Sequence, residues 1–230
     1  MPHRPTSRRE VVAYVAPFII YVVPAMLESK GWFAFQYETV CTLKGVIAAA
    51  ALWVFRRHYP PLATKGCGLA IIAGVAGCVV WILFDRLQAA IPGLQSFLNG
   101  LVGSRAGYDP FAGGGSATIR TAFVIVRVIE MAAIVPVLEE VFWRGFLARY
   151  LLADDFQDAP QGVFTPSSFI IVTLAFASVH PEILAAIAWG ALINLLYRRT
   201  ANLWACVAMH SVTNGLLCGY ILTTGNWQLW

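Results

Sequence analysis

Apolar runs long enough to cross a lipid bilayer recur along this chain, and they constrain its fold more than any other feature. A run of about 20 apolar residues predicts a membrane-spanning helix. Several of the runs are too short to cross alone, and 118–152 is too long for one straight span, so Pro136 is expected to kink or break it. The expected helices lie at about 10–27, 33–55, 67–90, 118–137, 138–152, 167–180, 183–197 and 203–222.

The composition agrees with this pattern. Of the 230 residues, 59% are hydrophobic and 12% are charged, against about 45–50% and 25% in soluble domains. The sequence therefore predicts an all-α, polytopic membrane bundle of about seven to eight helices, with the lipid bilayer as a partner. The net charge of +4 is spread between the apolar runs without a basic patch, so no nucleic-acid partner is expected. The five cysteines form no C-x-x-C pair and are expected to be small buried hydrophobes.

The positions of the basic residues predict an orientation in the membrane. They fall on alternate connections between the runs, which the positive-inside rule assigns to the cytoplasm together with the N-terminus. The longest polar interruption, 91–117, is rich in Gly, Ser and Asp and is expected to be a loop on the other side. The basic residues concerned are Arg4, Arg8, Arg9, Arg56, Arg57, Lys65, Arg149, Arg198 and Arg199.

Two acidic residues and an arginine interrupt the apolar run that ends near residue 152. In a helix Glu140 and Arg144 stand at i,i+4, the spacing of an intrahelical ion pair. Glu139 lies about 100° round the helix and has no basic residue at i+3 or i+4. Because ionisable side chains at membrane depth are costly unless they are paired or face a polar cavity, Glu139 marks a candidate functional site. In the preceding helix, Arg127 and Glu130 at i,i+3 are expected to pair internally or to line a cavity.

Further polar groups recur at helical spacing in the C-terminal half. His180 follows Phe176 at i,i+4, and His210 and Asn214 share one face of the last helix. A buried carboxylate beside imidazoles is suited to activating water, and an Asn amide with a second His can donate hydrogen bonds to an oxyanion. Two His and one Glu are also a known catalytic zinc set, so Glu139, His180 and His210 are the alternative metal ligands. The absence of an H-E-x-x-H signature weakens that alternative.

Counting along the helices raises one difficulty. Glu139 falls near the cytoplasmic end of its helix, and His180 falls near the opposite end of the next one. If the two side chains meet, the helix over 138–152 must be tilted or a span must be broken.

Three motifs, in order and at ordinary intervals, resemble the motif set of the CPBP family, the intramembrane CAAX-processing proteases and their bacterial relatives. The resemblance covers about residues 118–222. It implies a bundle of about eight helices that encloses a site within the membrane. The motifs are Glu139-Glu140-x-x-x-Arg144, Phe176-x-x-x-His180 and His210-x-x-x-Asn214.

The resemblance also implies roles for these residues. Glu139 with His180 activates water, while His210 and Asn214 stabilise the oxyanion. Glu140, Arg144 and Phe176 are supporting residues, with Phe176 expected to pack rather than to touch substrate. The resemblance favours a glutamate mechanism without a metal or other cofactor.

These observations predict a single integral membrane domain over 1–230, with N-terminal spans and the extramembrane loop in 1–117 and catalytic core helices in 118–222. The first hypothesis is an intramembrane endopeptidase that cleaves a lipophilic, membrane-associated protein or peptide near its C-terminal or membrane-embedded part. The alternative is a catalytically silent membrane adaptor or immunity protein on the same scaffold. A transporter with a proton relay is disfavoured because the chain lacks two symmetric halves. The expected location is a bacterial inner membrane, with a tag or leader other than a prenyl group on the substrate.

Overall fold

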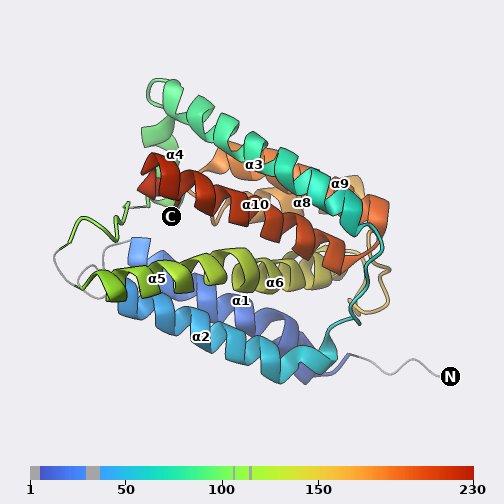
Figure 1. Ribbon diagram of the computed structural model, residues 1–230. Coiled ribbons are helices and arrows are strands. Elements are labelled where there is room, and N and C mark those ends of the chain that lie inside the picture. The colour runs from blue at the N-terminus through green and yellow to red at the C-terminus, as the bar shows by residue number, and fades with distance from the viewer. Residues whose placement is uncertain (1–5, 30–36, 106, 114–115) are drawn as a thin grey trace.

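The computed structural model of the chain is a bundle of helices that run roughly side by side (Figure 1). It describes residues 6–29, 37–105, 107–113 and 116–230, and these contain no β-strand. The all-helical bundle expected from the apolar runs is therefore confirmed. Five of the described helices are long and apolar enough to cross a membrane, and the chain is an integral membrane protein.

The longest connections between successive helices lie between α4 and α5 and between α7 and α8. Shorter π-helical segments, η3 (Glu130–Ile134) and η4 (Val141–Leu147), interrupt the helix that begins at Ala117. The α-helices are α1 (Arg8–Ser29), α2 (Tyr37–Phe55), α3 (Cys67–Ala90), α4 (Leu94–Val102), α5 (Ala117–Ile129), α6 (Val135–Glu140), α7 (Ala148–Tyr150), α8 (Pro166–Ala177), α9 (Ile183–Thr200) and α10 (Leu203–Thr224).

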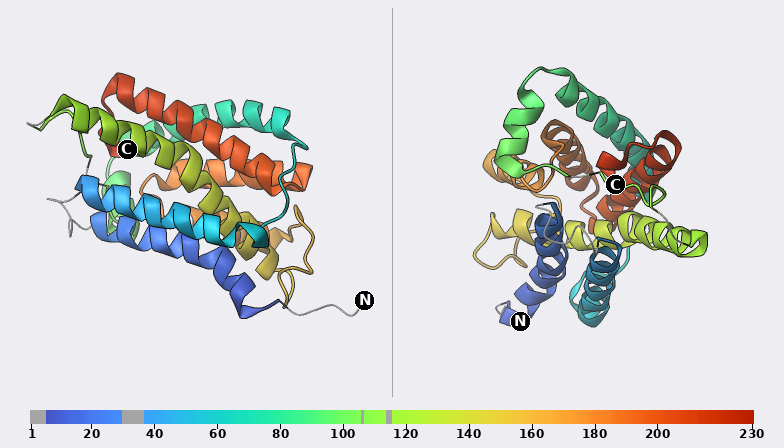
Figure 2. Two further views of the ribbon diagram at one scale, coloured as in Figure 1. Left: turned by 60° about the horizontal axis from the view of Figure 1, so that its bottom comes forward. Right: turned by 90° about the vertical axis from the view of Figure 1, so that its left-hand side faces the viewer.

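The continuous helix from α5 to α7 lies between two groups of helices. On one side α1 packs against α2, and on the other side α3 packs against α9 and α10 (Figures 1 and 2). The central helix contacts α10 through η3 and α1 through η4. Its residues therefore face both halves of the bundle, and its position decides what lies at the centre.

Two expectations about helix boundaries were wrong. The runs 118–137 and 138–152 form one helical segment, Ala117–Tyr150, which continues through Pro136 instead of breaking there. Pro136 sits at the start of α6, directly after the π-helical segment η3, where the wider turn accommodates the missing N–H. The stretch 91–117 contains the nine-residue helix α4 as well as loop.

Glycines allow α3 to approach α9 and α10 closely. A Cβ atom added to Gly74 would lie 2.7 Å from the backbone oxygen of Met209 in α10. One added to Gly77 would lie 2.8 Å from Trp189 Nε1 and from Thr213 Oγ1. Small residues at helix contacts let backbones pack tightly in lipid, where burial of apolar surface gives little drive to associate. These glycines therefore hold α9 and α10 at a fixed distance from α3.

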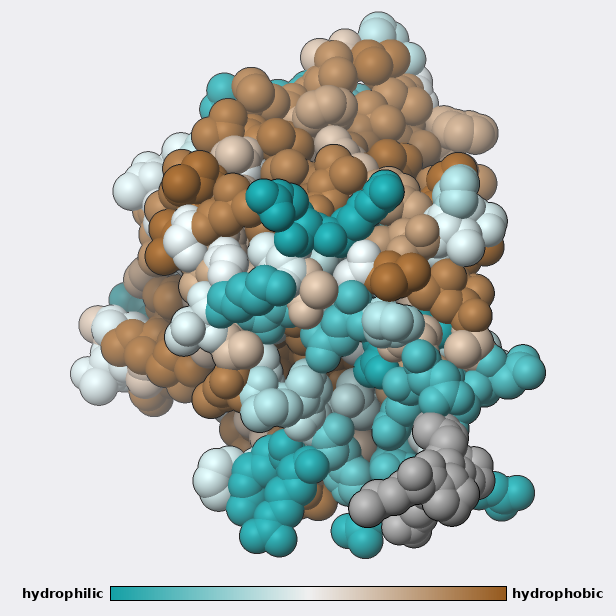
Figure 3. All heavy atoms as spheres, turned by 90° about the vertical axis from the view of Figure 1, so that its right-hand side faces the viewer, coloured by the Kyte–Doolittle hydropathy of each residue, from teal (hydrophilic) through white to brown (hydrophobic). Residues whose placement is uncertain are grey.

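One end of the bundle has a hydrophilic surface. Hydrophilic surface gathers at the end that includes the N-terminal residues, and apolar surface flanks it (Figure 3). At this end Asn202 bonds the backbone oxygens of Ala63 and Lys65, and Tyr14 bonds that of His58. Of the basic residues used to predict the orientation, Arg56, Arg57 and Lys65 lie between α2 and α3, and Arg198 and Arg199 lie in the last turn of α9. The opposite end carries α4 and the loop that follows it.

We expect Gly74→Ala to destabilise the bundle by about 1–3 kcal/mol, the usual cost of forcing extra volume into a packed core. The backbone of Met209 cannot move aside as a flexible side chain can. The measurement is the midpoint of thermal unfolding in detergent. Gly68→Ala in the same helix is the matched control, because nothing lies within 4 Å of its added Cβ. It should unfold at an equal or higher temperature, and equal losses in both variants would contradict the packing argument.

Candidate active site

His180 lies at the tip of a reversal between two helices. The short helix α8 begins with a capping box of Thr165 and Ser168, and it ends after 12 residues at Ala177. The chain then turns, and α9 returns toward the end where α8 began. The ring Nδ1 of His180 lies 2.8 Å from the backbone oxygen of Phe176. Since a carbonyl only accepts, Nδ1 carries the proton, and Nε2 is left as an acceptor.

A glutamine on α3 fixes this tip. The Gln88 amide donates to the backbone oxygen of Pro181 at 3.0 Å and accepts from the backbone N–H of Leu184 at 3.0 Å. The side chain of Gln88 is fully buried. The sequence placed Glu139 and His180 near opposite ends of successive helices. The chain reverses between α8 and α9 within the bundle, and this reversal brings His180 to the same cavity as Glu139.

The two glutamates of the central helix point in different directions, as their spacing predicts. Glu139 lines the cavity with 8% of its surface exposed, and its Oε2 is buried without a hydrogen-bond partner. Glu140 is fully buried and does not line the cavity. The π-helical segments before and after α6 widen the helix on both sides of this pair. Such turns are frequent at functional sites.

Glu140 holds a buried network that joins three helices. Its Oε1 accepts hydrogen bonds from Arg144 Nη1 at 3.1 Å and from His210 Nδ1 at 2.9 Å. Arg144 is fully buried and also donates from Nε to Asn194 on α9, at 3.1 Å. Its guanidinium lies 5.3 Å from the ring centre of Phe176. The expected Glu140–Arg144 pair is present, and it also fixes His210.

An aromatic side chain supports both histidines. Trp189 on α9 meets the ring of His210 edge to face at 4.7 Å and stacks with Phe176 at 5.3 Å. Its Nε1 donates to Thr213 Oγ1, which donates to the backbone oxygen of Gly74. Because Phe176 provides the oxygen that holds His180, Trp189 packs against the supports of both imidazoles.

Asn214 donates a hydrogen bond to a backbone oxygen of the central helix that lacks a donor within that helix. The N–H of Val135 bonds the oxygen of Glu130, and Pro136 has no N–H. The oxygen of Met131 therefore has no donor from the residues four and five positions on. The Asn214 amide donates to it at 2.9 Å. One of its two N–H hydrogens is used in this way, and the second stays available.

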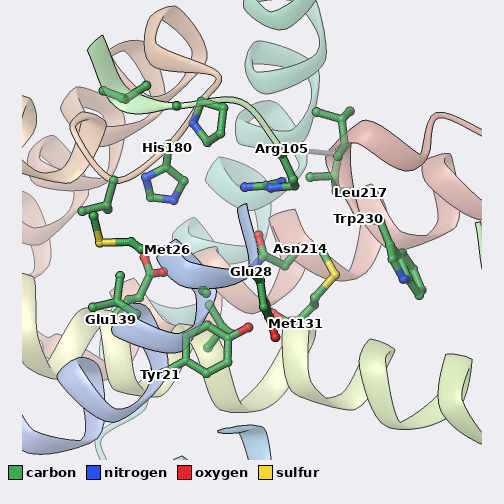
Figure 4. Close-up of a pocket in the computed structure, with 18 of the residues that line it drawn as sticks. Tyr21, Met26, Glu28, Arg105, Met131, Glu139, His180, Asn214, Leu217 and Trp230 are labelled. Atoms are coloured by element: carbon green, nitrogen blue, oxygen red, sulfur yellow. The ribbon is translucent and has the colours of Figure 1, made fainter. Parts of the chain in front are cut away.

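All four candidate catalytic residues line one cavity of about 340 Å³. The cavity lies between the two halves of the bundle, and Figure 4 shows Glu139, His180 and Asn214 around it. At the end away from the N-terminus its wall includes the loop residues Arg105 and Tyr108. Burial and a hydrogen bond to Glu38 raise the pKa of Tyr108 to about 12, so its phenol stays protonated and donates.

The sequence missed several residues that support this site. Gln88, Thr173, Trp189, Asn194 and Thr213 are buried or nearly buried hydrogen-bonding groups within apolar helices. Polar residues at membrane depth are a usable signal for function. Their partners, however, lie far away in the sequence, and no spacing rule connects them.

The structure also shows how the candidate metal ligands and the cysteines are placed. Within the described residues, no group of three or more His, Cys, Asp and Glu side chains is placed to hold a metal ion. Glu139, His180 and His210 therefore line one cavity without forming a ligand set. The cysteines are free, and four of them are buried, namely Cys41, Cys78, Cys206 and Cys218.

Fold and site together define an integral membrane helix bundle with a polar cavity among its helices. The family model for type II CAAX prenyl endopeptidases of the Rce1-like kind matches residues 121–216. These residues include all three motifs, and the resemblance to the CPBP family of CAAX-type proteases is confirmed. Comparisons with curated proteins and with solved structures give no match.

We expect Arg144→Ala to destabilise the protein by about 3–5 kcal/mol, because it leaves the buried charge of Glu140 without its guanidinium partner. The double variant Glu140→Gln with Arg144→Met should be milder, since it removes both charges and keeps an acceptor for His210. Thermal unfolding and yield in membranes measure both effects. A double variant as unstable as the single one would show that the two charges do not support each other.

Proposed function

We propose that the protein is an intramembrane endopeptidase of the CAAX type, in which Glu139 activates the attacking water. The observation that carries the proposal is the buried, unpartnered oxygen of Glu139 in the wall of a cavity that also contains His180, His210 and Asn214. An intramembrane carboxylate without a basic partner has no structural benefit to offset its cost. A cavity large enough for water and a peptide carbonyl gives it a chemical use.

The proposed reaction is the addition of water to a peptide carbonyl. Glu139 takes the proton of the water as its oxygen bonds to the carbonyl carbon, and Nε2 of His180 orients that water as an acceptor. The carbonyl oxygen becomes an oxyanion. The C–N bond then breaks, and the proton held by Glu139 passes to the leaving amine. Atoms and charge balance without a co-reactant.

Two donors are proposed for the oxyanion. The second amide hydrogen of Asn214 is one, and Nε2 of His210 is the other, which requires a doubly protonated ring. The carboxylate of Glu140 accepts from Nδ1 of that ring, and this contact fixes the direction of Nε2. Donors fixed in advance lower the barrier because they need no reorganisation during the reaction. The bond to Met131 fixes Asn214 in the same way.

The distribution of charge supports a proposed orientation in the membrane. We propose that the end with the basic connections faces the cytoplasm. The loop after α4, which forms part of the cavity wall, then lies on the side of the membrane away from the cytoplasm. We propose that the substrate approaches the cavity from that side. A bacterial inner membrane, with the N-terminus in the cytoplasm, stays the proposed setting.

Glu139→Gln should abolish proteolysis while the protein stays folded and abundant, since Gln keeps the shape of the side chain and removes the base. The measurement compares membrane proteomes of cells that express either form. A lipophilic protein should accumulate uncleaved with Glu139→Gln and not with Asp154→Asn, an exposed loop variant with the same loss of charge. Identical proteomes for the wild type and Glu139→Gln would contradict the enzyme and favour the adaptor.

Activity should survive exhaustive chelation, and purified protein should contain far less than one zinc per chain. The proposed base and hydrogen-bond donors need no metal. Metal content by mass spectrometry and cleavage rates before and after chelation are the measurements. If zinc is present at about one per chain, and activity is lost with it and regained on its return, the metal-free mechanism is wrong.

A further inference from the structure

The part of the cavity away from Glu139 is lined by cations. Among the described residues of the cavity wall, the charged groups there are Lys44, Arg105 and Arg127, together with Glu28. Glu28 and Lys44 form an ion pair. With Glu139 included, the side chains of three cations and two carboxylates face the cavity, and a doubly protonated His210 adds one more positive charge, so the wall is positive overall. The proposed reaction assigns no role to the positive charges of Lys44, Arg105 and Arg127.

Arg127 presents its charge to the cavity, while its carboxylate partner lies behind the wall. Its Nη1 donates to Glu130 Oε2 at 3.0 Å and to Tyr21 Oη at 3.2 Å. Glu130 does not line the cavity and packs against α2, where its Oε1 would lie 2.9 Å from a Cβ on Gly45. The Nε of Arg127 is buried without a hydrogen-bond partner. A buried guanidinium with an unused donor is suited to binding an anion.

Arg105 is a second cation of the wall, and it forms a long ion pair with Glu182. Its Nη1 lies 3.7 Å from Glu182 Oε1, which is beyond hydrogen-bond distance. Its side chain is 31% exposed, and Figure 4 shows it extending into the cavity. Glu182, like Glu130, is not part of the wall. Both arginines thus line the cavity, Arg127 as a buried residue and Arg105 as a partly exposed one.

We propose that this part of the cavity binds the C-terminal carboxylate of the substrate peptide, with Arg127 and Arg105 as its ligands. The proposal rests on the proposed function and deepens it. A carboxylate carries a single negative charge, which the positive wall can neutralise. A phosphate group carries more charge, and it would meet Glu28 on the same wall.

The central helix sets the distance between this subsite and the base. Arg127, Met131, Val135 and Glu139 follow one another at intervals of four residues, and all of them line the cavity. Twelve residues, five of them in the π-helical segment η3, separate the backbone ends of this row by at most about 18 Å. An extended peptide covers about 3.3–3.6 Å per residue. A substrate held at Arg127 is therefore cut only a few residues from its C-terminus.

A binding experiment tests the subsite without catalysis. The probes are two fluorescein-labelled, palmitoylated octapeptides of the same sequence, one ending in a carboxylate and the other in a carboxamide. Their dissociation constants are measured by fluorescence polarisation on the Glu139→Gln protein in detergent micelles. The two peptides share the lipid and the sequence. The ratio of their dissociation constants therefore measures the contribution of the terminal charge alone. We expect the carboxylate form to bind about 10-fold to 100-fold more tightly, as for hydrogen bonds to charged groups.

The variants assign that preference to the proposed residues. Arg127→Gln together with Glu130→Gln removes the cation and its partner, so no buried charge is stranded, and the ratio should fall to about one. Arg105→Gln should reduce the ratio in part. Arg86→Gln on α3 is the matched control, since this arginine bonds Tyr220 and does not line the cavity. It should keep the full preference.

The outcomes separate this proposal from the proposed function. Equal affinities of the two peptides, or a preference that survives in the Arg127→Gln/Glu130→Gln protein, would overturn the subsite. Cleavage of both peptides by the wild type at equal rates would also overturn it while leaving the endopeptidase intact. A clear carboxylate preference with no cleavage by the wild type would support the subsite and count against the enzyme. Mass spectrometry of the products gives the distance of the cut from the C-terminus.

Discussion

The buried contact of Glu140 with both Arg144 and His210 is the interaction on which the rest of the site depends. One carboxylate oxygen accepts from a guanidinium on its own helix and from an imidazole on α10. Removing a charge from such a network leaves an uncompensated ion in a medium that cannot solvate it. The network therefore sets how the central helix is rotated against α10, and Glu139 reaches the cavity because Glu140 occupies the other face.

The central helix shows how a local irregularity can serve a distant residue. Pro136 and the π-helical segment before it leave the oxygen of Met131 without an intrahelical donor, and a buried carbonyl in lipid needs one. Asn214 on α10 supplies the donor. Polar groups on two helices thus satisfy each other at the cavity wall. Replacing either helix with a regular, apolar one would remove the site and its support together.

The sequence predicted the parts of this architecture that depend on local spacing. Apolar runs gave the helices, and i,i+4 spacing gave the Glu140–Arg144 pair and the shared face of His210 and Asn214. It could not predict the continuity of the helix through Pro136, because a π-helical segment has no reliable sequence pattern. It also could not predict the contact of His210 with Glu140, or the support from Trp189, since both join segments far apart in the chain. Only tertiary packing decides such contacts. The catalytic roles themselves stay predictions.

The two halves of the bundle contribute different groups to the cavity. The side formed by α3 and α8–α10 carries the imidazoles and the carboxamide, whereas α1 and α2 contribute Tyr21, Glu28 and Lys44. The family match likewise begins at residue 121, after those first helices. A chain divided in this way can alter the shape and charge of its first helices while the opposite wall stays unchanged. The groups that α1 and α2 add to the cavity can then vary between related chains while the polar groups of the opposite wall stay in place.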